Sequence, residues 1–282
     1  MARQDTLSIL ASGTTKDKLA ELDGKLIENI QKEALSAKLK NTDYSGDPTT
    51  GSVEVNRFKN ATANDYGTAR EGGKGDALKN TGKVTINIDQ DKEIVEEIAG
   101  KDLALFGIAD LADRRTKNHA SRVVANLDSV FFATAEAAAS AVTIASGVTA
   151  IEDVVETMIQ AIETTSNDWV DGVDRDMIDL TLSPAAYGKL RNHIDKVMVA
   201  NDAGQEEIAM FHGVRVHSNT RQSVAILAMV NGAVAQPVMT NQYEAEKIGL
   251  SNDFAIELFY SYGTKAVMPD LIKKLAALPA AS

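Results

Sequence analysis

The stretch DYGTAREGGKGDALKNTGK, Asp65–Lys83, decides how the rest of this sequence is interpreted. Its nineteen residues include five glycines and only three aliphatic side chains. The segments on either side, 51–58 and 82–89, alternate apolar and polar residues, which predicts a half-buried β-ribbon. The polar stretch is too long for a tight hairpin turn, and loops of more than about 12–15 residues are usually functional or disordered. The sequence therefore predicts an extended ribbon with a long polar tip.

Apolar residues spaced three and four apart predict several amphipathic helices. The first spans 14–39, carries Leu26 and Ile30 on its apolar stripe, and needs a surface to lie on. From Asp91 the spacing turns helical again, and a long helix is predicted over 110–139. A helix of about 30 residues spans about 45 Å, which is unusual for a compact enzyme.

The second half of the chain mixes helices and strands. Thr149 is expected to cap one helix, and Ser183 is expected to cap another that follows a buried strand over 177–182. Further strands are predicted at FHGVRVHS (211–218), SVAILAMV (223–230), AVAQPVMT (233–240) and FAIELFYSYGTKAVM (254–268). Because the elements do not follow a regular βαβ alternation, the sequence predicts the α+β class.

The chain has 282 residues, 44% of them hydrophobic, and a formal net charge of −11. No window gathers the Lys and Arg residues that a duplex-binding protein shows. The most acidic segment, 151–182, is interpreted as a solvated face, with a divalent-cation site as the minor alternative. Cysteine is absent, which excludes disulfides and thiolate chemistry. No signal peptide and no apolar run of about 18 residues is found, so we expect no membrane span.

The sequence predicts no catalytic, cofactor-binding or metal-binding residues. The Gly-Lys pair at 82–83 leads into a strand, whereas a phosphate-binding loop leads into a helix. His119 is expected on a solvated helix face, and His212 and His217, five residues apart in one strand, on opposite faces. Ser183 is better explained as a helix cap than as a nucleophile. We therefore expect a protein that is not an enzyme and uses no cofactor or metal.

Four parts of the sequence occur in a characteristic order. They are KVTINIDQDKEIVEEIAGKDLA (83–104), ADLADRRTKNHASRVVANLDSVFFATA (109–135), DMIDLTLSPAAYGKLRN (176–192), and the run from IAMFHGVRVHSNT through VAILAMVNGAVAQPV to IELFYSYGTKAVMPDLIKKL (208–275). Together they resemble the major capsid proteins of tailed bacteriophages, which have the Hong Kong 97-type fold. The resemblance covers essentially the whole chain.

The resemblance implies a domain organisation within the α+β class. The implied parts are an N-terminal arm with an amphipathic helix over 1–48, an extended β-ribbon loop over 49–92, a peripheral domain with a spine helix over 93–140 and 241–270, and an axial domain over 141–240 and 271–282. It implies a structural subunit that assembles into an icosahedral virion capsid around packaged double-stranded DNA, in the host bacterial cytoplasm. The alternatives are the shell of an encapsulin-like compartment and an enzyme with an unrecognised pocket.

The resemblance also implies partners. The first is the chain itself, in hexamers and pentamers, because the ribbon in such capsids reaches over an adjacent subunit. Candidate inter-subunit contact residues are Arg57, Lys59, Arg70, Lys74, Lys79, Leu26 and Ile30. Other implied partners are a portal protein, a decoration protein in some heads, and packaged DNA through weak contacts. Only about fifty residues precede the ribbon, so a separate scaffolding protein is expected.

The way in which such a shell is locked follows from the same resemblance. Without cysteine we expect non-covalent contacts to hold it. The alternative is an isopeptide bond between a ribbon lysine and an asparagine of a neighbour, with a nearby Glu to take up the proton. Candidates for that bond are Lys59, Lys74, Lys79, Asn126 and Asn252.

Overall fold

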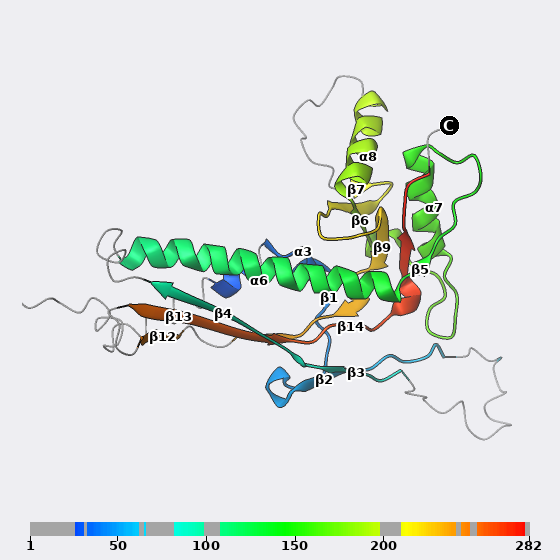
Figure 1. The fold of residues 1–282 in the computed structure, drawn as a ribbon. Coiled ribbons are helices and arrows are strands. Elements are labelled where there is room, and N and C mark those ends of the chain that lie inside the picture. The colour runs from blue at the N-terminus through cyan, green and yellow to red at the C-terminus, as the bar shows by residue number, and fades with distance from the viewer. Residues whose placement is uncertain are drawn as a thin grey trace, which may run out of the picture.

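The computed structural model describes residues 26–30, 33–61, 65, 82–98, 108–197, 210–240, 244–248 and 253–279. These residues form an elongated molecule with two arms that meet at an angle (Figure 1). The first arm contains α6 (Ile108–Ala138) and a sheet beside it. The second arm contains α7 (Ile151–Glu163), α8 (Pro184–Val197) and a six-stranded sheet. No helix in these ranges combines the length and apolar content needed to cross a membrane.

The described strands form four sheets. The remaining elements are α3 (Leu35–Leu39), β1 (Lys40–Asn41), β2 (Ser52–Val55), β3 (Val84–Asn87), β4 (Gln90–Ile98), β5 (Ser140–Ala141), β6 (Ile178–Leu182), β7 (Met210–Phe211), β8 (Val214–Ser218), β9 (Ile226–Val230), β10 (Val234–Ala235), β11 (Val238–Thr240), β12 (Glu244–Lys247), β13 (Phe254–Tyr262), β14 (Lys265–Ala266) and β15 (Ile272–Leu275). The sheet orders are β1-β10-β14, β11-β13-β12 with β4 also paired to β13, β5-β15-β9-β6-β8-β7, and β2-β3. Short 3₁₀ helices occupy Pro48–Thr50, Arg175–Met177 and Pro269–Leu271.

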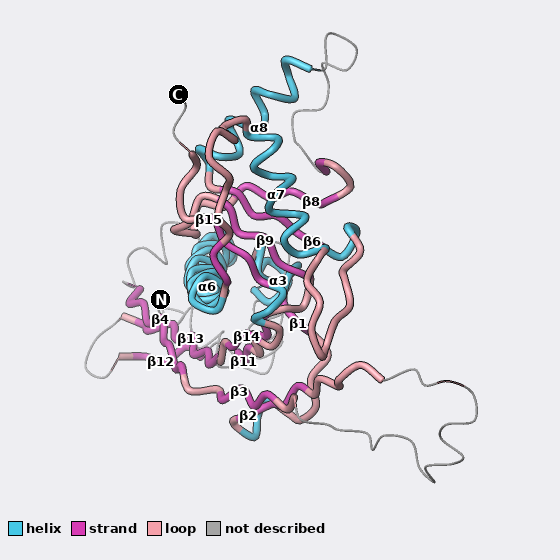
Figure 2. The backbone as a smooth tube through the Cα atoms, turned by 90° about the vertical axis from the view of Figure 1, so that its right-hand side faces the viewer, coloured by secondary structure: helices cyan, strands magenta, loops and turns pink. Residues whose placement is uncertain are grey.

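Helix α6 packs on one face of the sheet that β4 and β13 form. Val123 and Leu127 of the helix belong to one buried cluster with Leu258 and Tyr260 of β13. Viewed nearly along its axis, the helix lies between this sheet and the six-stranded sheet (Figure 2). Its 31 residues give a length of about 46 Å at 1.5 Å per residue. The prediction of a long helix over 110–139 is confirmed.

The six-stranded sheet is covered on both faces. Its central strands β6 and β9 are buried at every residue, as expected for strands with apolar neighbours on either side. On one face α7 contributes Val154, Met158 and Ile159. On the other, the C-terminal part of α6 contributes Phe131 and Phe132. The same helix therefore packs against two sheets and joins the two arms.

A buried carboxylate fixes the N-terminal segment on α6. Asp128 of α6 is 1% exposed and accepts hydrogen bonds from the backbone N–H groups of Leu35 and Ser36, at 3.4 and 3.0 Å. Helix α3 begins at Leu35, and its N-cap residue Ala34 makes no side-chain hydrogen bond, so Asp128 caps the helix from a distant part of the chain. The Nη1 of Arg221 donates to the same carboxylate at 2.8 Å and balances its charge.

The helix predicted over 14–39 lies partly outside the described residues. Residues 26–30 are helical, but Ala34 is extended, with φ −73° and ψ 120°, so the prediction of one unbroken helix is wrong. The interruption gives α3 a separate N-terminus for Asp128 to cap. Leu26 and Ile30 are 0% and 9% exposed and pack against α6 and β13.

The segment from Asp91 onward was predicted as helical, but its first part, up to Ile98, belongs to strand β4, and 99–107 lie outside the described residues. The prediction is wrong because Ile94 and Ile98 fit a period of two as well as a helical spacing. Pairing decides between the two periods: β4 matches β13 in an unbroken antiparallel register that ends with Ile98 opposite Phe254. Tertiary pairing overrides local spacing here.

Two predictions about helix N-termini had different outcomes. The N-cap of α7 is Ala150, without a side-chain hydrogen bond, so the predicted Thr149 cap is wrong. Ser183 precedes α8, and its Oγ accepts a hydrogen bond from the N–H of Ala186 at 3.4 Å, which confirms the predicted cap.

His119 is buried, whereas a solvated face was predicted. Its side chain is 1% exposed, and its Nε2 lies 2.9 Å from Oε2 of Glu96 on β4. Arg115 binds the same carboxylate through its guanidinium group. Burial, and then the charge of Arg115, lower the pKa of His119 to about 4. The neutral imidazole therefore lies between helix and strand, in a position that only the correct assignment of β4 could have predicted.

The carboxylates of the acidic segment are partly paired rather than simply solvated. Arg175 bridges Glu156 and Glu163, with N–O distances of 2.6 and 2.5 Å. Asp179 is 1% exposed and pairs with Arg215 at 2.8 Å. Within the described ranges, no three His, Cys, Asp or Glu side chains are grouped so as to hold a metal ion.

The two histidines predicted in one strand lie in different places. His212 occupies the turn between β7 and β8 with a φ of 49°, and its Nδ1 is 2.8 Å from Glu156. His217 lies in β8, and its Nε2 is 3.1 Å from Asp179. Each histidine therefore belongs to a separate ion-pair cluster.

The substitution Asp128→Ala should destabilise the protein. It leaves Arg221 without its partner and removes the cap of α3, and breaking such a buried pair costs about 3 kcal/mol in the free energy of unfolding. Urea unfolding followed by circular dichroism measures this. Asp43→Ala, at an exposed position, is the control and should change the free energy by less than about 0.5 kcal/mol. Equal stability of the two variants would contradict the role given to Asp128.

The burial of His119 predicts a pH dependence of stability. Because its pKa falls from 6.5 to about 4 on folding, the unfolded chain binds the proton at higher pH. The free energy of unfolding is therefore highest above about pH 6.5. It decreases as the pH falls toward 4, because the unfolded chain takes up the proton that the folded chain excludes. His119→Gln should flatten the slope of unfolding free energy against pH in that window. His193→Gln removes a partly exposed histidine, and equal slopes in the two variants would refute the prediction.

Candidate functional site

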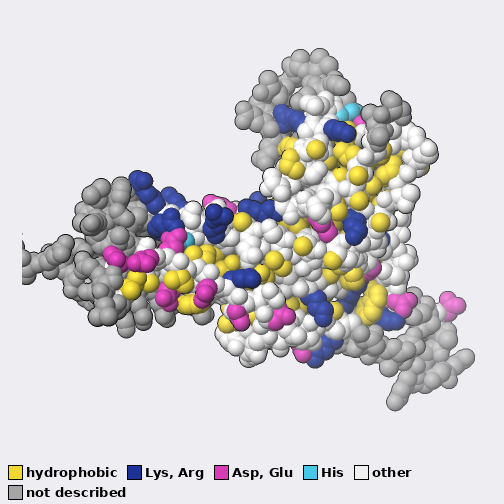
Figure 3. Space-filling model, viewed as in Figure 1, with side chains coloured by type: hydrophobic (Ala, Val, Ile, Leu, Met, Phe, Trp, Pro, Cys, Tyr) yellow, Lys and Arg dark blue, Asp and Glu magenta, His cyan; other side chains and the backbone are white. Residues whose placement is uncertain are grey.

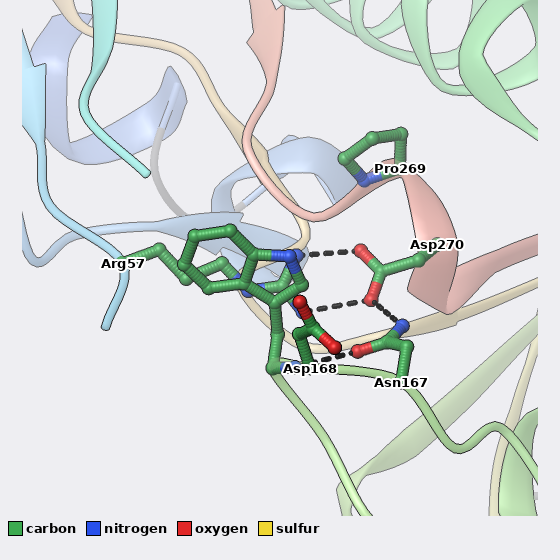
Figure 4. Close-up of a pocket in the computed structure, with 6 residues that line it drawn as sticks. Arg57, Asn167, Asp168, Pro269 and Asp270 are labelled. Atoms are coloured by element: carbon green, nitrogen blue, oxygen red, sulfur yellow. Dashed lines mark hydrogen bonds and ion pairs between the residues drawn. The ribbon is translucent and has the colours of Figure 1, made fainter. Parts of the chain in front are cut away.

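The ribbon is anchored to the loop that follows α7. Beyond β2 and before β3, the two ribbon segments lie together, with the N–H of Arg57 donating to the carbonyl of Gly82 at 3.2 Å. The N–H of Asn60 donates to the carbonyl of Asp168 at 2.8 Å, which ties the ribbon to the loop. The close-up in Figure 4 shows the side chains that converge here from the ribbon, this loop and the turn at Pro269. We call this cluster the ribbon anchor.

A forked ion pair forms the inner part of the ribbon anchor. The two terminal nitrogens of Arg57 donate to the two carboxylate oxygens of Asp270 at 2.6 and 2.7 Å (Figure 4). The side chains are 15% and 23% exposed, so water screens the pair less than it screens a surface pair. Asn167 Nδ2 donates to the same carboxylate at 2.8 Å. Burial raises the pKa of Asp270, but the hydrogen bonds from Arg57 and Asn167 outweigh it and lower the net value.

Trp169 forms the outer part of the ribbon anchor. The guanidinium carbon of Arg57 and the Nζ of Lys59 lie 5.3 and 5.5 Å from the centre of its ring, within cation–π range. Lys59 also pairs with Asp168 at 2.6 Å, although both groups are exposed. Asn167 shapes the loop, because its Oδ1 accepts the N–H of Trp169 at 2.8 Å.

Gly82 allows the ribbon to approach the ring closely. A Cβ at this position would lie 2.6 Å from the carbonyl oxygen of Arg57 and 2.8 Å from the Trp169 ring. Carbon atoms do not approach each other to such distances without a shift of the backbone or ring. The glycine is therefore required for contact between ribbon and loop.

The ribbon anchor surrounds a shallow, open hollow of about 420 Å³. Arg57, Asn167, Asp168 and Asp270 line it, and each is already bonded to a neighbour within the cluster. The hydrogen bond with Lys59 lowers the pKa of Asp168, and for Asp270 the hydrogen bonds outweigh burial and lower its pKa, so both carboxylates serve as charged acceptors. The arrangement has the chemistry of a structural joint, because its charged groups neutralise one another.

The structure brings only some of the predicted contact residues together. Arg57 and Lys59 both reach the ring of Trp169 in their own chain. Leu26 and Ile30 lie in the core between α6 and β13, where their own chain covers them. The other three ribbon residues lie outside the described residues, namely Arg70, Lys74 and Lys79.

Asn126, a candidate for a covalent bond to a neighbour, is bound within its own chain. Its Nδ2 donates to the hydroxyl groups of Tyr260 and Tyr262 at 3.1 Å each. Asn252 lies outside the described residues. Sequence reasoning missed Trp169 and Asp270, although Trp169 is the only tryptophan of the chain and follows the turn-forming pair Asn-Asp.

Comparison with solved structures identifies the fold of this chain, whereas comparison of sequences finds no match. No protein-family model matches the chain, and no curated protein matches its sequence. A chain of Mycobacterium phage Che8 is similar in structure, with a TM-score of 0.66 and 18% identity over 86% of this chain and 91% of that chain. A chain from the capsid of the cyanophage P-SCSP1u has a TM-score of 0.59 and 14% identity, covering 88% and 89%. A virus-like particle from Pyrococcus furiosus gives 0.57 and 14%, covering 91% and 98%.

Each of these structural matches extends over most of this chain and most of the chain with which it is compared. The chain has the α+β fold of phage capsid structures, and the Hong Kong 97-type fold predicted from the sequence is confirmed. Identities of 14–18% establish the fold and nothing finer.

Gly82→Ala should open the ribbon anchor. The added methyl group displaces the Trp169 ring, and because this is the only tryptophan, its fluorescence emission reports the change directly. We expect a red-shifted emission maximum and loss of the contact with Arg57. Gly188→Ala is the control, since nothing lies within 4 Å of a Cβ there and an alanine within a helix stabilises by about 0.5–1 kcal/mol. Unchanged emission in Gly82→Ala would disprove the close contact.

Proposed function

We propose that this chain is a structural subunit of an icosahedral bacteriophage head that encloses packaged double-stranded DNA. The observation that carries the proposal is the likeness to a chain of the P-SCSP1u capsid over 88% of this chain, together with the likeness to a chain of phage Che8 over 86%. The elongated two-armed shape supports it, because an extended subunit leaves long edges for neighbours to cover (Figure 1).

The ribbon anchor supports the proposal mechanically. The ribbon's two segments, which enclose the stretch that carries Arg70, Lys74 and Lys79, are fixed at Arg57 and Gly82. A ribbon fixed at its base can transmit load between its own subunit and a neighbour that it contacts. Lys59 and the three ribbon cations remain our candidates for that contact.

The domain boundaries given by the resemblance become part of this proposal. In it, the arm over 1–48, the ribbon over 49–92 and the axial domain over 141–240 and 271–282 attach to a peripheral domain formed by 93–140 and 241–270. The proposed role is structural and not enzymatic, and the proposed location is the virion. A portal protein, a scaffolding protein and a decoration protein are proposed partners on the strength of the resemblance alone.

The encapsulin-like alternative is less well supported. Two of the similar structures come from phages, namely Che8 and the cyanophage P-SCSP1u, and the second is a capsid structure. The virus-like particle from Pyrococcus furiosus shares the fold at 14% identity, which does not distinguish the two kinds of shell.

Expression of the full chain tests the proposal. We expect closed shells of megadalton mass by size-exclusion chromatography and negative-stain electron microscopy. After boiling in SDS they should give one band near 30.1 kDa, because non-covalent contacts hold them. A ladder of multimers would refute non-covalent locking, and a monomer at every protein concentration would refute the shell function.

Variants of the ribbon sharpen this test. Deletion of 66–79 should leave a folded subunit by circular dichroism but prevent closed shells. A Gly/Ser segment of equal length in the same place is the matched control, because it keeps the length and removes the side chains. Normal shells from both variants would show that the ribbon is dispensable for assembly.

A further inference from the structure

The turn between β9 and β10 contains the pair Asn231 and Gly232. Asn231 is the only asparagine of the chain that is followed by a glycine. The N–H of Ala233 donates to the carbonyl of Val230 at 3.0 Å and closes the turn, and Gly232 has a φ of 85°. A positive φ at the third residue is the mark of a type II turn, in which glycine is favoured. Asn231 is exposed at the surface of this turn, whereas Gly232 is buried.

An asparagine followed by glycine undergoes a spontaneous reaction when the pair is free to move. Water or hydroxide removes the proton of the glycine backbone nitrogen, which then attacks the side-chain carbonyl carbon of the asparagine. A carbon–nitrogen bond forms, ammonia leaves, and a five-membered succinimide ring results. Water opens the ring on either side and gives aspartate or isoaspartate, so a carboxylate replaces a neutral amide. Glycine favours the reaction because no Cβ obstructs the approach of the two groups.

A segment from the N-terminal part of the chain holds both reacting groups. We call this segment, Leu35–Asn41, the clamp; it comprises α3 and β1. The N–H of Gly232, whose nitrogen would attack, donates to the carbonyl of Leu39 at 2.9 Å. The Nδ2 of Asn231, which would leave as ammonia, donates to the carbonyl of Lys38 at 3.3 Å. Two consecutive residues of the clamp therefore bind the nucleophile and the leaving group.

Further contacts attach the clamp to this turn and to α6. The Nδ2 of Asn41 donates to the carbonyl of Gly232 at 3.1 Å, and β1 pairs with β10 in parallel. Leu39 is 1% exposed and belongs to one buried cluster with Phe131, while Asp128 caps α3. The clamp lies near the junction of the two arms, where Figure 3 shows an open angle between them. The protection of the turn thus depends on a segment that is distant in sequence.

We propose that Asn231 is a deamidation site that the clamp protects, and that its conversion makes detachment of the clamp permanent. The inference does not depend on the proposed function, because it concerns contacts within one chain. A backbone N–H that donates a hydrogen bond gives up its proton to solvent mainly when that bond opens, which is the basis of hydrogen-exchange protection. Attack by the nitrogen of Gly232 is therefore limited to the fraction of time in which the clamp is detached.

The product of the reaction cannot restore the original contacts. An ionised carboxylate has no N–H to donate, so the bond to the carbonyl of Lys38 is lost and two acceptor oxygens face each other. Isoaspartate also adds a methylene group to the main chain, which displaces the nitrogen of Gly232 from the carbonyl of Leu39. Detachment of the clamp is reversible before the reaction and permanent after it, so the clamp and the turn together act as a one-way switch.

Incubation of the whole chain at mildly alkaline pH measures the protection. The tryptic peptide 222–247 contains Asn231, and mass spectrometry with fragmentation detects the replacement of its side-chain NH₂ by OH. The same peptide, free in solution, gives the rate without protection. We expect the chain to deamidate at least about tenfold more slowly than the peptide, which corresponds to about 1.4 kcal/mol of protection. Equal rates in chain and peptide would overturn the proposal.

Leu39→Ala tests whether the clamp controls the reaction. The substitution removes buried contacts of the clamp and should raise the deamidation rate of Asn231 about tenfold. Met158→Ala is the matched control, because it removes buried contacts in the cluster around α7, away from the clamp, and should leave that rate unchanged. Urea unfolding compares the global stability of the two variants. No acceleration in Leu39→Ala, or equal acceleration in both variants, would overturn the role of the clamp.

Further variants test the switch itself. Asn41→Ala removes one hydrogen bond of the clamp at a partly exposed position, so it should accelerate deamidation even if Leu39→Ala folds poorly. Asn231→Asp places the carboxylate of the product in the turn, and trypsin should then cut after Lys38 and Lys40 faster than in the wild type. Asn231→Gln keeps an amide and should show wild-type cleavage and no mass change. Cleavage of Asn231→Asp at the wild-type rate would refute permanent detachment.

Discussion

The burial of two apolar stripes on one unbroken helix, α6, holds this protein together. The middle of α6 packs through Val123 and Leu127 onto the β4–β13 sheet, and its C-terminal part packs through Phe131 and Phe132 onto the six-stranded sheet. Because a helix is stiff, the rotation from one stripe to the next fixes the angle between the two arms. Asp128 lies between the two stripes and attaches the N-terminal segment there, so three parts of the chain meet on one element.

An element of the fold could be predicted from the sequence when its own residues carried the pattern, and could not when a distant segment determined it. The helix over 110–139, the buried strand before Ser183 and the strands beside the ribbon tip were all predictable, because each carries its own periodicity. Strand β4 was not, since its nine residues fit two periods and only β13 selects one. The burial of His119 followed from that error. The ribbon anchor joins segments over a hundred residues apart, through Trp169 and Asp270, and no spacing in the sequence predicts such a contact.

Arginine and lysine have different roles among the described ion pairs. The partly or fully buried carboxylates, such as Asp270, Asp179 and Asp128, are each bound by an arginine. The described lysine pairs, in contrast, are exposed, as at Lys59 with Asp168. A planar guanidinium satisfies both oxygens of a carboxylate at once and loses less hydration on burial than an ammonium does. Among the described ion pairs, arginine thus neutralises these more buried carboxylates, whereas the lysine pairs lie at the surface.

The pairing of β4 with β13 also sets the order in which a newly made chain can fold. The ribosome releases β4 and α6 well before Phe254–Tyr262 has been synthesised. Until then the unpaired edge of β4 and the apolar stripe of α6 remain uncovered, and exposed strand edges of this kind favour aggregation. Contacts between residues so far apart in sequence also slow folding, since the intervening loop must close first. Folding of this arm therefore depends on the rapid arrival of β13, and chaperones that shield nascent chains are best placed to act on this interval.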